Sequence, residues 1–247
     1  MIPDKNSVVP LYHQIKEGLR EEIEAGLYQP GDLLPPEHEL CKRYGVSRIT
    51  VRQAVLDLAR EGLVDRKRGK GTFVCQPKIQ QDLLGFYDFT RQLEATGREQ
   101  TVRVLSVERV ESEAVATWLG LPRDEPLVRI MRLRIVDDEP LILEKTFVSA
   151  RRFPGIERED FSSTPVYYRM ITERFGVALG RAVKFLEPVL VDAYASAFLG
   201  VKKGSPGLLV VRVTYAVDGT PVVVTKWLVR GDRCRHYVEV GPHPRQI

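Results

Sequence analysis

The residues with the clearest capacity for chemistry are basic, and they lie close together in the sequence. Between residues 42 and 70, nine basic side chains stand against three acidic ones. They include Arg48 and Arg52, one helical turn apart, and Arg68 and Lys70 beside glycines. Guanidinium groups suit phosphate oxygens and guanine edges, so this window predicts a surface that binds a nucleic-acid backbone. The alternative for such a charge run is an ordinary solvated helix face.

A second group of charged residues lies in the other half of the chain. Arg132 and Arg134 alternate within an apolar run from Leu127 to Val136, and Glu144 follows in the next such run. Alternate residues of a strand point to the same face, so both guanidinium groups could converge on an anion. The alternative is a solvent-facing position for both arginines, with Glu144 as their salt-bridge partner.

The sequence contains no recognisable motif of a catalytic or metal centre. Its four histidines are scattered, and we find no nucleophile elbow and no phosphate-binding loop. Cys41, Cys75 and Cys234 are far apart and show no CxxC spacing, which argues against a zinc site or a disulfide framework. No apolar run approaches the roughly 20 residues of a membrane span. We expect a cytoplasmic protein that is not an enzyme and uses no cofactor and no metal.

The basic window has the pattern of two helices joined by a tight turn. A preceding helix is predicted from Leu11 to Leu27, where apolar residues recur every four positions. Pro36 and Glu37 open a second helix, and Gly45 ends it in a left-handed conformation. Ser47 is a good N-cap for the third helix, whose inward stripe ends at Leu58. This arrangement is typical of a helix-turn-helix.

The third helix would present its N-terminal end to DNA. In helix-turn-helix proteins that end contacts base edges in the major groove. Arginine can read guanine, glutamine can read adenine, and threonine or isoleucine methyl groups can contact thymine. The candidate DNA-binding residues of this segment are Ser47, Arg48, Ile49, Thr50, Arg52 and Gln53.

A basic hairpin follows the third helix directly. Two short strands, Leu63–Arg66 and Gly71–Val74, are predicted around a turn that contains Arg68, Gly69 and Lys70. Glycines there allow the backbone to approach a duplex closely. We interpret the hairpin as a DNA-contacting wing, and an ordinary solvated hairpin is the alternative.

The chain is predicted to divide at a polar, proline-containing stretch. We expect a winged helix-turn-helix domain at residues 1–75, a linker at 76–82 and a second domain at 83–247. In the second domain, a weak internal repeat places two hairpins after two short helices, which predicts an antiparallel sheet. The predicted strands are Thr101–Glu111, Leu127–Val136, Leu141–Val148, Arg181–Val191, Leu208–Val217 and Val222–Val229. The predicted helices are Phe86–Ala95, Ser112–Leu119, Pro165–Phe175 and Asp192–Leu199.

The segment from about Val9 to Val74 resembles the GntR family of bacterial transcription regulators. The matching motifs are Pro30-Gly31, Leu34-Pro35, Glu37 with Glu39-Leu40, Gly45-Val46-Ser47-Arg48, Thr50-Val51-Arg52, Glu61-Gly62 and Gly69-x-Gly71-Thr72-Phe73-Val74. The resemblance implies DNA contacts from Arg48, Thr50, Arg52, Arg68 and Gly69. It departs at His38, where the family usually has an arginine that contacts the backbone. We keep His38 among the candidate DNA-binding residues.

The second domain resembles the UTRA effector domain of the HutC subfamily of these regulators. The matching motifs include Arg132-Leu133-Arg134, Leu143-Glu144, Phe153-Pro154-Gly155-Ile156 and Val166-Tyr167. The resemblance implies a chorismate-lyase-like α/β (α+β) fold with flanking helices, a homodimer and a small-molecule pocket. The candidate effector-binding residues are Arg132, Arg134, Glu144, Tyr167, Gly85, Phe86 and Thr225.

Four departures from sugar-phosphate-sensing relatives bear on the expected effector. Gly85 and Pro165 stand where those relatives often have serines, and Val223 and Val229 stand where they tend to have Glu and Tyr. Burial of sugar hydroxyls without partners is costly, so we expect an anion with fewer hydroxyls than an amino-sugar phosphate.

We therefore interpret the chain as a ligand-responsive transcription regulator, acting as a repressor that leaves a palindromic operator when a small anionic metabolite binds. A ligand-independent dimeric DNA-binding protein is one alternative, and a lyase-like enzyme is the more distant one.

Overall fold

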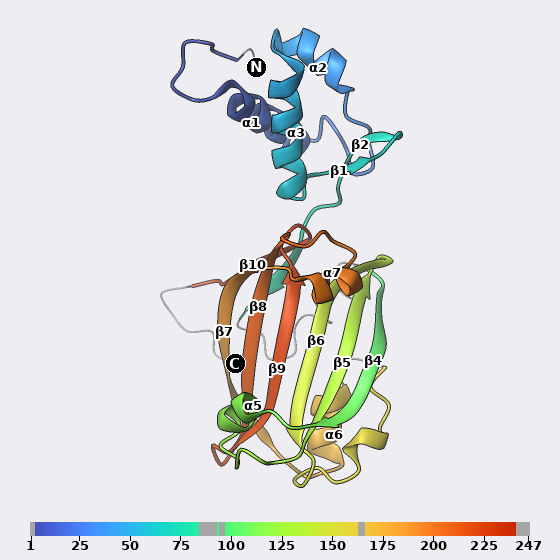
Figure 1. The fold of residues 1–247 in the computed structure, drawn as a ribbon, viewed down its shortest axis with the longest axis vertical. Coiled ribbons are helices and arrows are strands. Elements are labelled where there is room, and N and C mark those ends of the chain that lie inside the picture. Colours follow the sequence, from blue (N-terminus) through green and yellow to red (C-terminus); the bar gives the residue numbers. More distant parts are fainter. Residues whose placement is uncertain (1–2, 84–92, 94–96, 163–165, 241–247) are drawn as a thin grey trace. The chain divides into compact units, whose positions relative to one another are not determined.

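A computed structural model describes residues 3–83, 93, 97–162 and 166–240, and the statements below concern those residues. The chain forms two compact units, each treated separately here. The head comprises residues 1–78 together with 231–233, and the effector unit comprises residues 79–230 and 234–247. Figure 1 shows the helical head and the strand-rich effector unit.

The head is a three-helix bundle followed by a hairpin, as the sequence predicts. Its elements in chain order are α1 (Leu11–Glu24), α2 (Glu37–Tyr44), α3 (Arg48–Arg60), β1 (Val64–Lys67) and β2 (Gly71–Val74). The predicted inward stripe of α3 is buried, together with Ile15 and Leu19 of α1. The first helix ends three residues before the predicted Leu27, which is 65% exposed. Gly26 takes a left-handed conformation there (φ 79°) and stops the helix.

A short segment from the far end of the chain completes the head. Residues 231–233 cluster with it, and Lys78 Nζ donates a hydrogen bond to the carbonyl of Gly231 at 2.7 Å. Gly62, just after α3, lies against the backbone of Asp232. A Cβ atom at Gly62 would come within 1.9 Å of the Asp232 carbonyl oxygen, and its φ of +76° also favours glycine. The sequence did not predict this return of the chain.

The effector unit is built on a six-stranded antiparallel sheet with the order β4-β5-β6-β9-β8-β7. The strands are β4 (Gln100–Val110), β5 (Leu127–Val136), β6 (Glu139–Ser149), β7 (Leu179–Leu190), β8 (Pro206–Ala216) and β9 (Pro221–Arg230). All six predicted strands are present, with ends that differ from the prediction by up to two residues. The hairpins join β5 to β6 and β8 to β9, as the internal repeat indicates.

A second, two-stranded sheet was missed by the sequence analysis. Strand β3 (Ile79–Asp82) pairs in parallel with β10 (Cys234–Tyr237). β3 lies inside the segment predicted to be a linker without regular structure. Its partner is more than 150 residues away in sequence, and Ile79 and Cys234 are both buried. Only this tertiary pairing makes such a short polar segment a strand.

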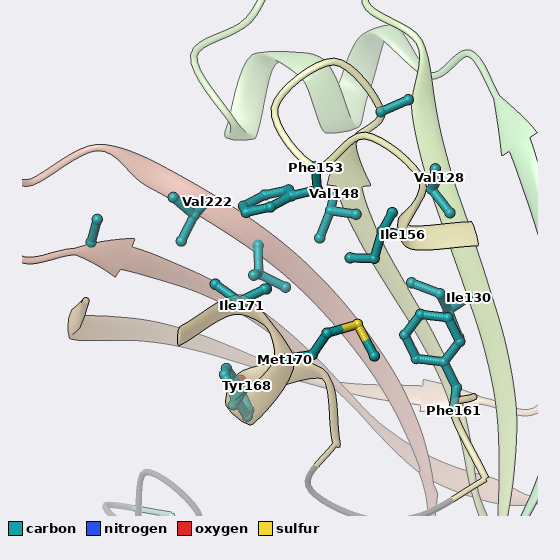
Figure 2. Packing of buried hydrophobic residues seen from close by; sticks show 13 residues of the cluster. Val128, Ile130, Val148, Phe153, Ile156, Phe161, Tyr168, Met170, Ile171 and Val222 are labelled. Atoms are coloured by element: carbon teal, nitrogen blue, oxygen red, sulfur yellow. The ribbon is translucent and has the colours of Figure 1, made fainter. Parts of the chain in front are cut away.

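Helices cover both faces of the six-stranded sheet. α6 (Val166–Glu173) packs on one face, where Tyr168, Met170 and Ile171 join Val128 and Ile130 in a buried cluster (Figure 2). The opposite face carries α5 (Glu113–Trp118) and α7 (Ala193–Leu199), with buried partners that include Phe147 and Leu143 respectively. The predicted helix Phe86–Ala95 falls largely outside the described residues, as does Pro165. The α/β fold with an antiparallel sheet and flanking helices is confirmed.

Candidate DNA-binding surface and effector site

The turn between α2 and α3 fixes the direction in which α3 begins. Gly45 closes α2 in a left-handed conformation (φ 61°), and Ser47 then has extended backbone angles. The Ser47 hydroxyl accepts a hydrogen bond from the Thr50 amide at 3.3 Å and lies 2.8 Å from the Thr50 hydroxyl. Ser47 is therefore the N-cap that the sequence predicted. The Ser47 side chain thus caps the first turn of α3, and Val51 of the same turn is buried in the core of the head.

The predicted DNA-binding residues of α3 lie mainly on its exposed side. Ile49 is 82% exposed, and the Arg48 side chain is 78% exposed. Arg52 is also exposed, whereas Thr50 and Gln53 are half-buried. Gln53 donates a hydrogen bond to Asp57 at 2.9 Å, so it is already engaged within the helix. The exposed Ile49 side chain is therefore available for contact with an apolar group outside the chain.

Glu37, at the start of α2, holds two arginines at this surface. Arg48 Nε and Arg66 Nη2 each donate a hydrogen bond to the Glu37 carboxylate at 3.0 Å. Glu37 thereby links α2, the start of α3 and the first strand of the hairpin. Arg66 was not among the predicted contacts, although its position just before the basic turn is a signal that could have found it.

The hairpin carries the other predicted DNA-binding residues. Arg68, Gly69 and Lys70 are exposed, and Gly69 makes the turn with a φ of +73°. His38 is exposed on α2, with its Nε2 3.8 Å from a carboxylate oxygen of Glu39. The head therefore presents cationic side chains from the start of α3 and from the wing, as the sequence predicts.

In the effector unit, the predicted charged residues form one buried triad. Glu144 of β6 lies between Arg132 and Arg134 of β5, and Arg132 and Glu144 have no exposed side-chain surface. Arg132 Nε donates to one carboxylate oxygen at 3.1 Å, and Arg134 Nε donates to the other at 2.9 Å. Thr146 donates a further hydrogen bond to Glu144 at 3.2 Å. The alternative of a solvent-facing Arg132 and Arg134 is wrong, although Glu144 is indeed their salt-bridge partner.

The ionisation of Glu144 is set by this triad. Complete burial alone would raise its pKa, because a carboxylate is poorly solvated in the protein interior. The positive charges of Arg132 and Arg134, and their hydrogen bonds, outweigh burial and lower the pKa of Glu144 to about 2. Glu144 is thus a carboxylate at neutral pH.

The triad belongs to a polar band that crosses the sheet on the face covered by α6. Three pairs of opposite residues on neighbouring strands define the row. Thr146 on β6 is paired with Thr225 on β9, Thr225 with Arg212 on β8, and Arg212 with Lys184 on β7. Paired residues of neighbouring strands share a face, so these side chains form one row beside the triad. Thr146, Thr225 and Arg212 are buried. Sequence analysis named Thr225 but missed Arg212 and Lys184, which have no motif around them.

Arg212 and Tyr168 connect this row to α6. The Arg212 guanidinium lies 4.9 Å from the centre of the Tyr168 ring, and the Tyr168 hydroxyl is 3.4 Å from that of Thr214. The predicted Tyr167 is the neighbouring residue of α6, but its side chain lies outside the described part of the structure. Gly85 and Phe86 also lie outside the described residues.

The two valines that the sequence analysis singled out, Val223 and Val229, are fully buried. Val223 packs in the cluster beneath α6, and Val229 packs in a second cluster with Ile79, Leu141 and Ile142. The polar band therefore lies between two hydrophobic clusters on one face of the sheet. The described residues contain no group of three or more potential metal ligands. The described part of the chain has no helix long and apolar enough to cross a membrane.

Comparison with protein families identifies both units. Residues 11–74 match the family described as bacterial regulatory proteins, gntR family, and residues 95–235 match the UTRA domain. The chain belongs to the GntR family. The resemblance stated from the sequence is thereby confirmed, and the chain is a DNA-binding transcription regulator with a UTRA effector domain.

Individual relatives support the same assignment over nearly the whole length of this GntR-family chain. It is 34% identical to the HTH-type transcriptional repressor NagR of Bacillus subtilis, over 96% of this chain and 98% of NagR. It is also 34% identical to the HTH-type transcriptional repressor PhnF of Mycolicibacterium smegmatis, over 90% of each chain. The crystal structure of PhnF from Mycobacterium smegmatis matches with a TM-score of 0.65 and 29% identity, covering 93% of this chain and 100% of that one.

Proposed function

We propose that this regulator is a homodimeric repressor that binds a palindromic operator and leaves it when a small anionic metabolite binds the effector unit. The observation that carries the DNA part is the exposed start of α3, where Arg48, Ile49 and Arg52 project from a helix fixed by its own cap. Two identical heads fit two half-sites because the two-fold symmetry of a dimer is mirrored in its operator.

Each candidate residue of the head has a role in this proposal. Arg48 and Arg52 read guanine edges or bind phosphates, and the exposed Ile49 contacts a thymine methyl group. Thr50, Gln53 and the free N–H groups after Ser47 add hydrogen bonds at the helix start. The wing residues Arg68, Gly69 and Lys70, together with His38 on α2, approach the backbone of the adjacent DNA, and these contacts set the register.

The polar band supports an anionic effector. Arg132, Arg134, Arg212 and Lys184 bring four positive charges to one face of the sheet, and Glu144 is the one carboxylate of the row and triad. Guanidinium and ammonium groups of this kind bind carboxylate and phosphate oxygens. Thr225 and Tyr167 would contact the same ligand, and Gly85 and Phe86 would border it.

Repression is relieved only if the effector binds two arrangements of the dimer unequally. We propose that binding in the effector unit changes the spacing of the two heads through the segment around residues 76–82. The names of NagR and PhnF, both repressors, support repression as the direction of control.

The DNA part can be tested by selecting binding sites from a random duplex library with the full-length protein. We expect the recovered sequences to share a palindrome, and two chains to bind each duplex in native mass spectrometry. The double variant Arg48→Ala/Arg52→Ala should recover no motif. Enrichment of a single unrepeated half-site, or unchanged selection by the double variant, would contradict the proposal.

The effector part can be tested by a thermal-shift screen of carboxylic acids and sugar phosphates, followed by operator binding with each stabilising compound. We expect anions that raise the melting temperature to weaken operator binding. Stabilisation by hexosamine phosphates alone would refute the expectation of an effector with fewer hydroxyls.

A further inference from the structure

Four buried, uncharged polar atoms of the effector unit have no hydrogen-bond partner among the described residues. They are Thr225 Oγ1 and Trp227 Nε1 on β9, Gln81 Oε1 on β3 and His236 Nε2 on β10. Thr225 has no exposed surface, and Gln81 is 8% exposed. A buried polar atom without a partner is destabilising, so native proteins contain few of them.

The two atoms on β9 lie beside the triad. Thr225 and Trp227 are two residues apart on one strand, so their side chains point to the same face of the sheet. Trp227 is paired with Glu144, and Thr225 is paired with Thr146. Both side chains therefore belong to the face that carries the polar band. Sequence analysis did not find Trp227, because none of the motifs that matched the family includes it.

The small parallel sheet carries the other two atoms on its buried face. Gln81 and His236 are partners in register. Ile79 and Cys234, two positions earlier on the same strands, pack in the buried cluster that Trp227 borders. Since alternate residues of a strand share a face, Gln81 and His236 point to the same side of the small sheet as this cluster.

A hydrogen bond joins the end of the small sheet to the row of the polar band. Lys184 of β7, paired with Arg212 in that row, donates from Nζ to the Leu83 carbonyl at 2.5 Å. The Leu83 amide donates to the Tyr237 carbonyl at the end of β10 at 3.1 Å. The pKa of His236 is lowered, mainly by burial and further by the charge of Lys184. The buried face of the small sheet and the polar band are therefore neighbours.

The hydrogen-bonding capacity of the four atoms is specific. The Trp227 indole only donates, the Gln81 carbonyl oxygen only accepts, and the Thr225 hydroxyl can do either. His236 is neutral at pH 7, so its Nε2 can accept a hydrogen bond. A group that satisfies all four must both accept and donate. A carboxylate cannot donate, and a methyl group can do neither.

We propose that Gln81, Thr225, Trp227 and His236 form a neutral subsite of the effector site, which binds a carboxamide group of the effector. The amide oxygen accepts from Trp227 and Thr225, and the amide NH2 donates to Gln81 and His236. A hydroxyl group could satisfy three of the four atoms. This inference rests on the proposed function, in which arginines of the polar band bind the acidic group, and it adds a second functional group to the effector.

The first test needs no ligand. Thr225 and Thr146 are paired and both have no exposed surface, but only the Thr146 hydroxyl has a partner, Glu144 at 3.2 Å. Without effector, we expect Thr225→Val to raise the melting temperature of the full-length protein by about 2–4 °C, and Thr146→Val to lower it by a similar amount. An equal decrease in both variants would overturn the proposal, because the Thr225 hydroxyl would then have a structural partner such as a buried water.

The second test uses monocarboxylic acids that share a carbon skeleton and differ at the other end. One series is adipamate, 6-hydroxyhexanoate, hexanoate and adipate, and a shorter series is succinamate, 4-hydroxybutyrate, butyrate and succinate. The full-length protein is titrated with each compound by calorimetry. In at least one series we expect the amide-ended acid to bind about tenfold or more tightly than the methyl-ended and dicarboxylic members, with the hydroxy acid between them.

The variants Trp227→Phe and Thr225→Val should remove most of that preference and leave the binding of the methyl-ended acid unchanged. Trp118→Phe is the matched control, because Trp118 is the other tryptophan of the chain and lies on α5, at the opposite face of the sheet. This control should keep the preference. Operator binding by each variant without any acid shows that the chain is folded.

The neutral subsite is refuted if the methyl-ended acids bind as tightly as the amide-ended ones in both series, if no amide-ended acid binds, or if Trp227→Phe and Thr225→Val both keep the preference. Failure of the proposed function gives a different result. In that case an amide-ended acid binds with the expected preference, but operator affinity does not change when it does.

Discussion

Two glutamates in this chain each hold two arginines, and their surroundings are opposite. Glu37 joins Arg48 and Arg66 at the surface of the head, where the Arg48 side chain is 78% exposed. Glu144 joins Arg132 and Arg134 inside the effector unit, where it has no exposed surface. In water an ion pair is only slightly more stable than its two charges when each is hydrated separately. In the protein interior, the loss of one partner leaves the other charge without solvation, which is strongly destabilising.

The difference indicates what each set of arginines is built to do. Arg48 can leave Glu37 for a phosphate or a base at small cost, because water and DNA offer comparable interactions. Arg132 cannot leave Glu144 without a replacement anion, because both side chains are buried and separation would leave their charges unsolvated. The arginines of the head can therefore exchange Glu37 for DNA, whereas the Arg132–Glu144–Arg134 triad is part of the fold of the effector unit.

The largest effect should come from neutralising the buried glutamate. Glu144→Gln removes the charge that balances Arg132 and Arg134, and we expect a loss of about 3–5 kcal/mol in the free energy of unfolding. Glu37→Gln is the matched change at the surface and should cost less than about 1 kcal/mol. Urea denaturation of both variants measures the contrast. Equal losses would show that burial does not distinguish the two clusters.

Low pH should lower the stability of the effector unit by protonating Glu144. The pKa of Glu144 falls from 4.5 to about 2 in the folded protein, so its stabilising contribution is fully present above about pH 4.5 and is lost as the pH falls towards 2. The shift corresponds to about 3 kcal/mol. Urea denaturation from pH 6 to pH 3 checks it. Glu144→Gln should lack this part of the pH dependence, and a parallel decline in both proteins would assign it to other carboxylates.

A change at the exposed cluster of Glu37, Arg48 and Arg66 should affect operator binding more than stability. Arg48→Ala should weaken operator binding about 10–100-fold, as expected for the loss of a contact worth about 1–3 kcal/mol. It should change the free energy of unfolding by less than about 1 kcal/mol. Fluorescence anisotropy with the selected operator measures the affinity. Arg60→Ala is the control, because Arg60 is an exposed arginine at the other end of α3, paired with Asp57. If both variants bind equally well, the start of α3 is not the reading surface.

The head was predictable from sequence because its signals are local. Gly45, Ser47 and the apolar spacing of α3 each act within one or two helical turns, and a specific family pattern covers the same segment. The end of α1 was misplaced because the apolar spacing continues to Leu27 while Gly26 has already broken the helix. The exposure of Arg48 and Ile49 also followed from the helical period alone.

The effector unit was predictable in its strands but only partly in its site. Arg132, Arg134 and Glu144 share one hairpin, so strand alternation and pairing bring them together. Arg212 and Lys184 come from strands that reach the same row only through the order of the whole sheet. Strand β3 was missed for the same reason, since its partner β10 is distant in sequence. Long-range pairing leaves no periodic signal in either segment.

The smallest predicted effect lies at His38, where the usual family arginine is absent. His38 is exposed on α2, and an arginine there would present a permanently charged, forked donor, so His38→Arg should add about one phosphate contact. We expect operator affinity to rise a few-fold at low salt and the slope of log affinity against log salt to steepen by about one. His13→Arg adds the same charge at an exposed position of α1 and controls for a general increase in charge. A steeper slope in both variants would reflect net charge alone, whereas a change confined to His38→Arg would extend the DNA-binding surface from α3 and the wing to α2. Both positions are exposed, so the free energy of unfolding of either variant should stay within about 0.5 kcal/mol of that of the parent protein. This small effect again separates the exposed surface of the head from the buried triad.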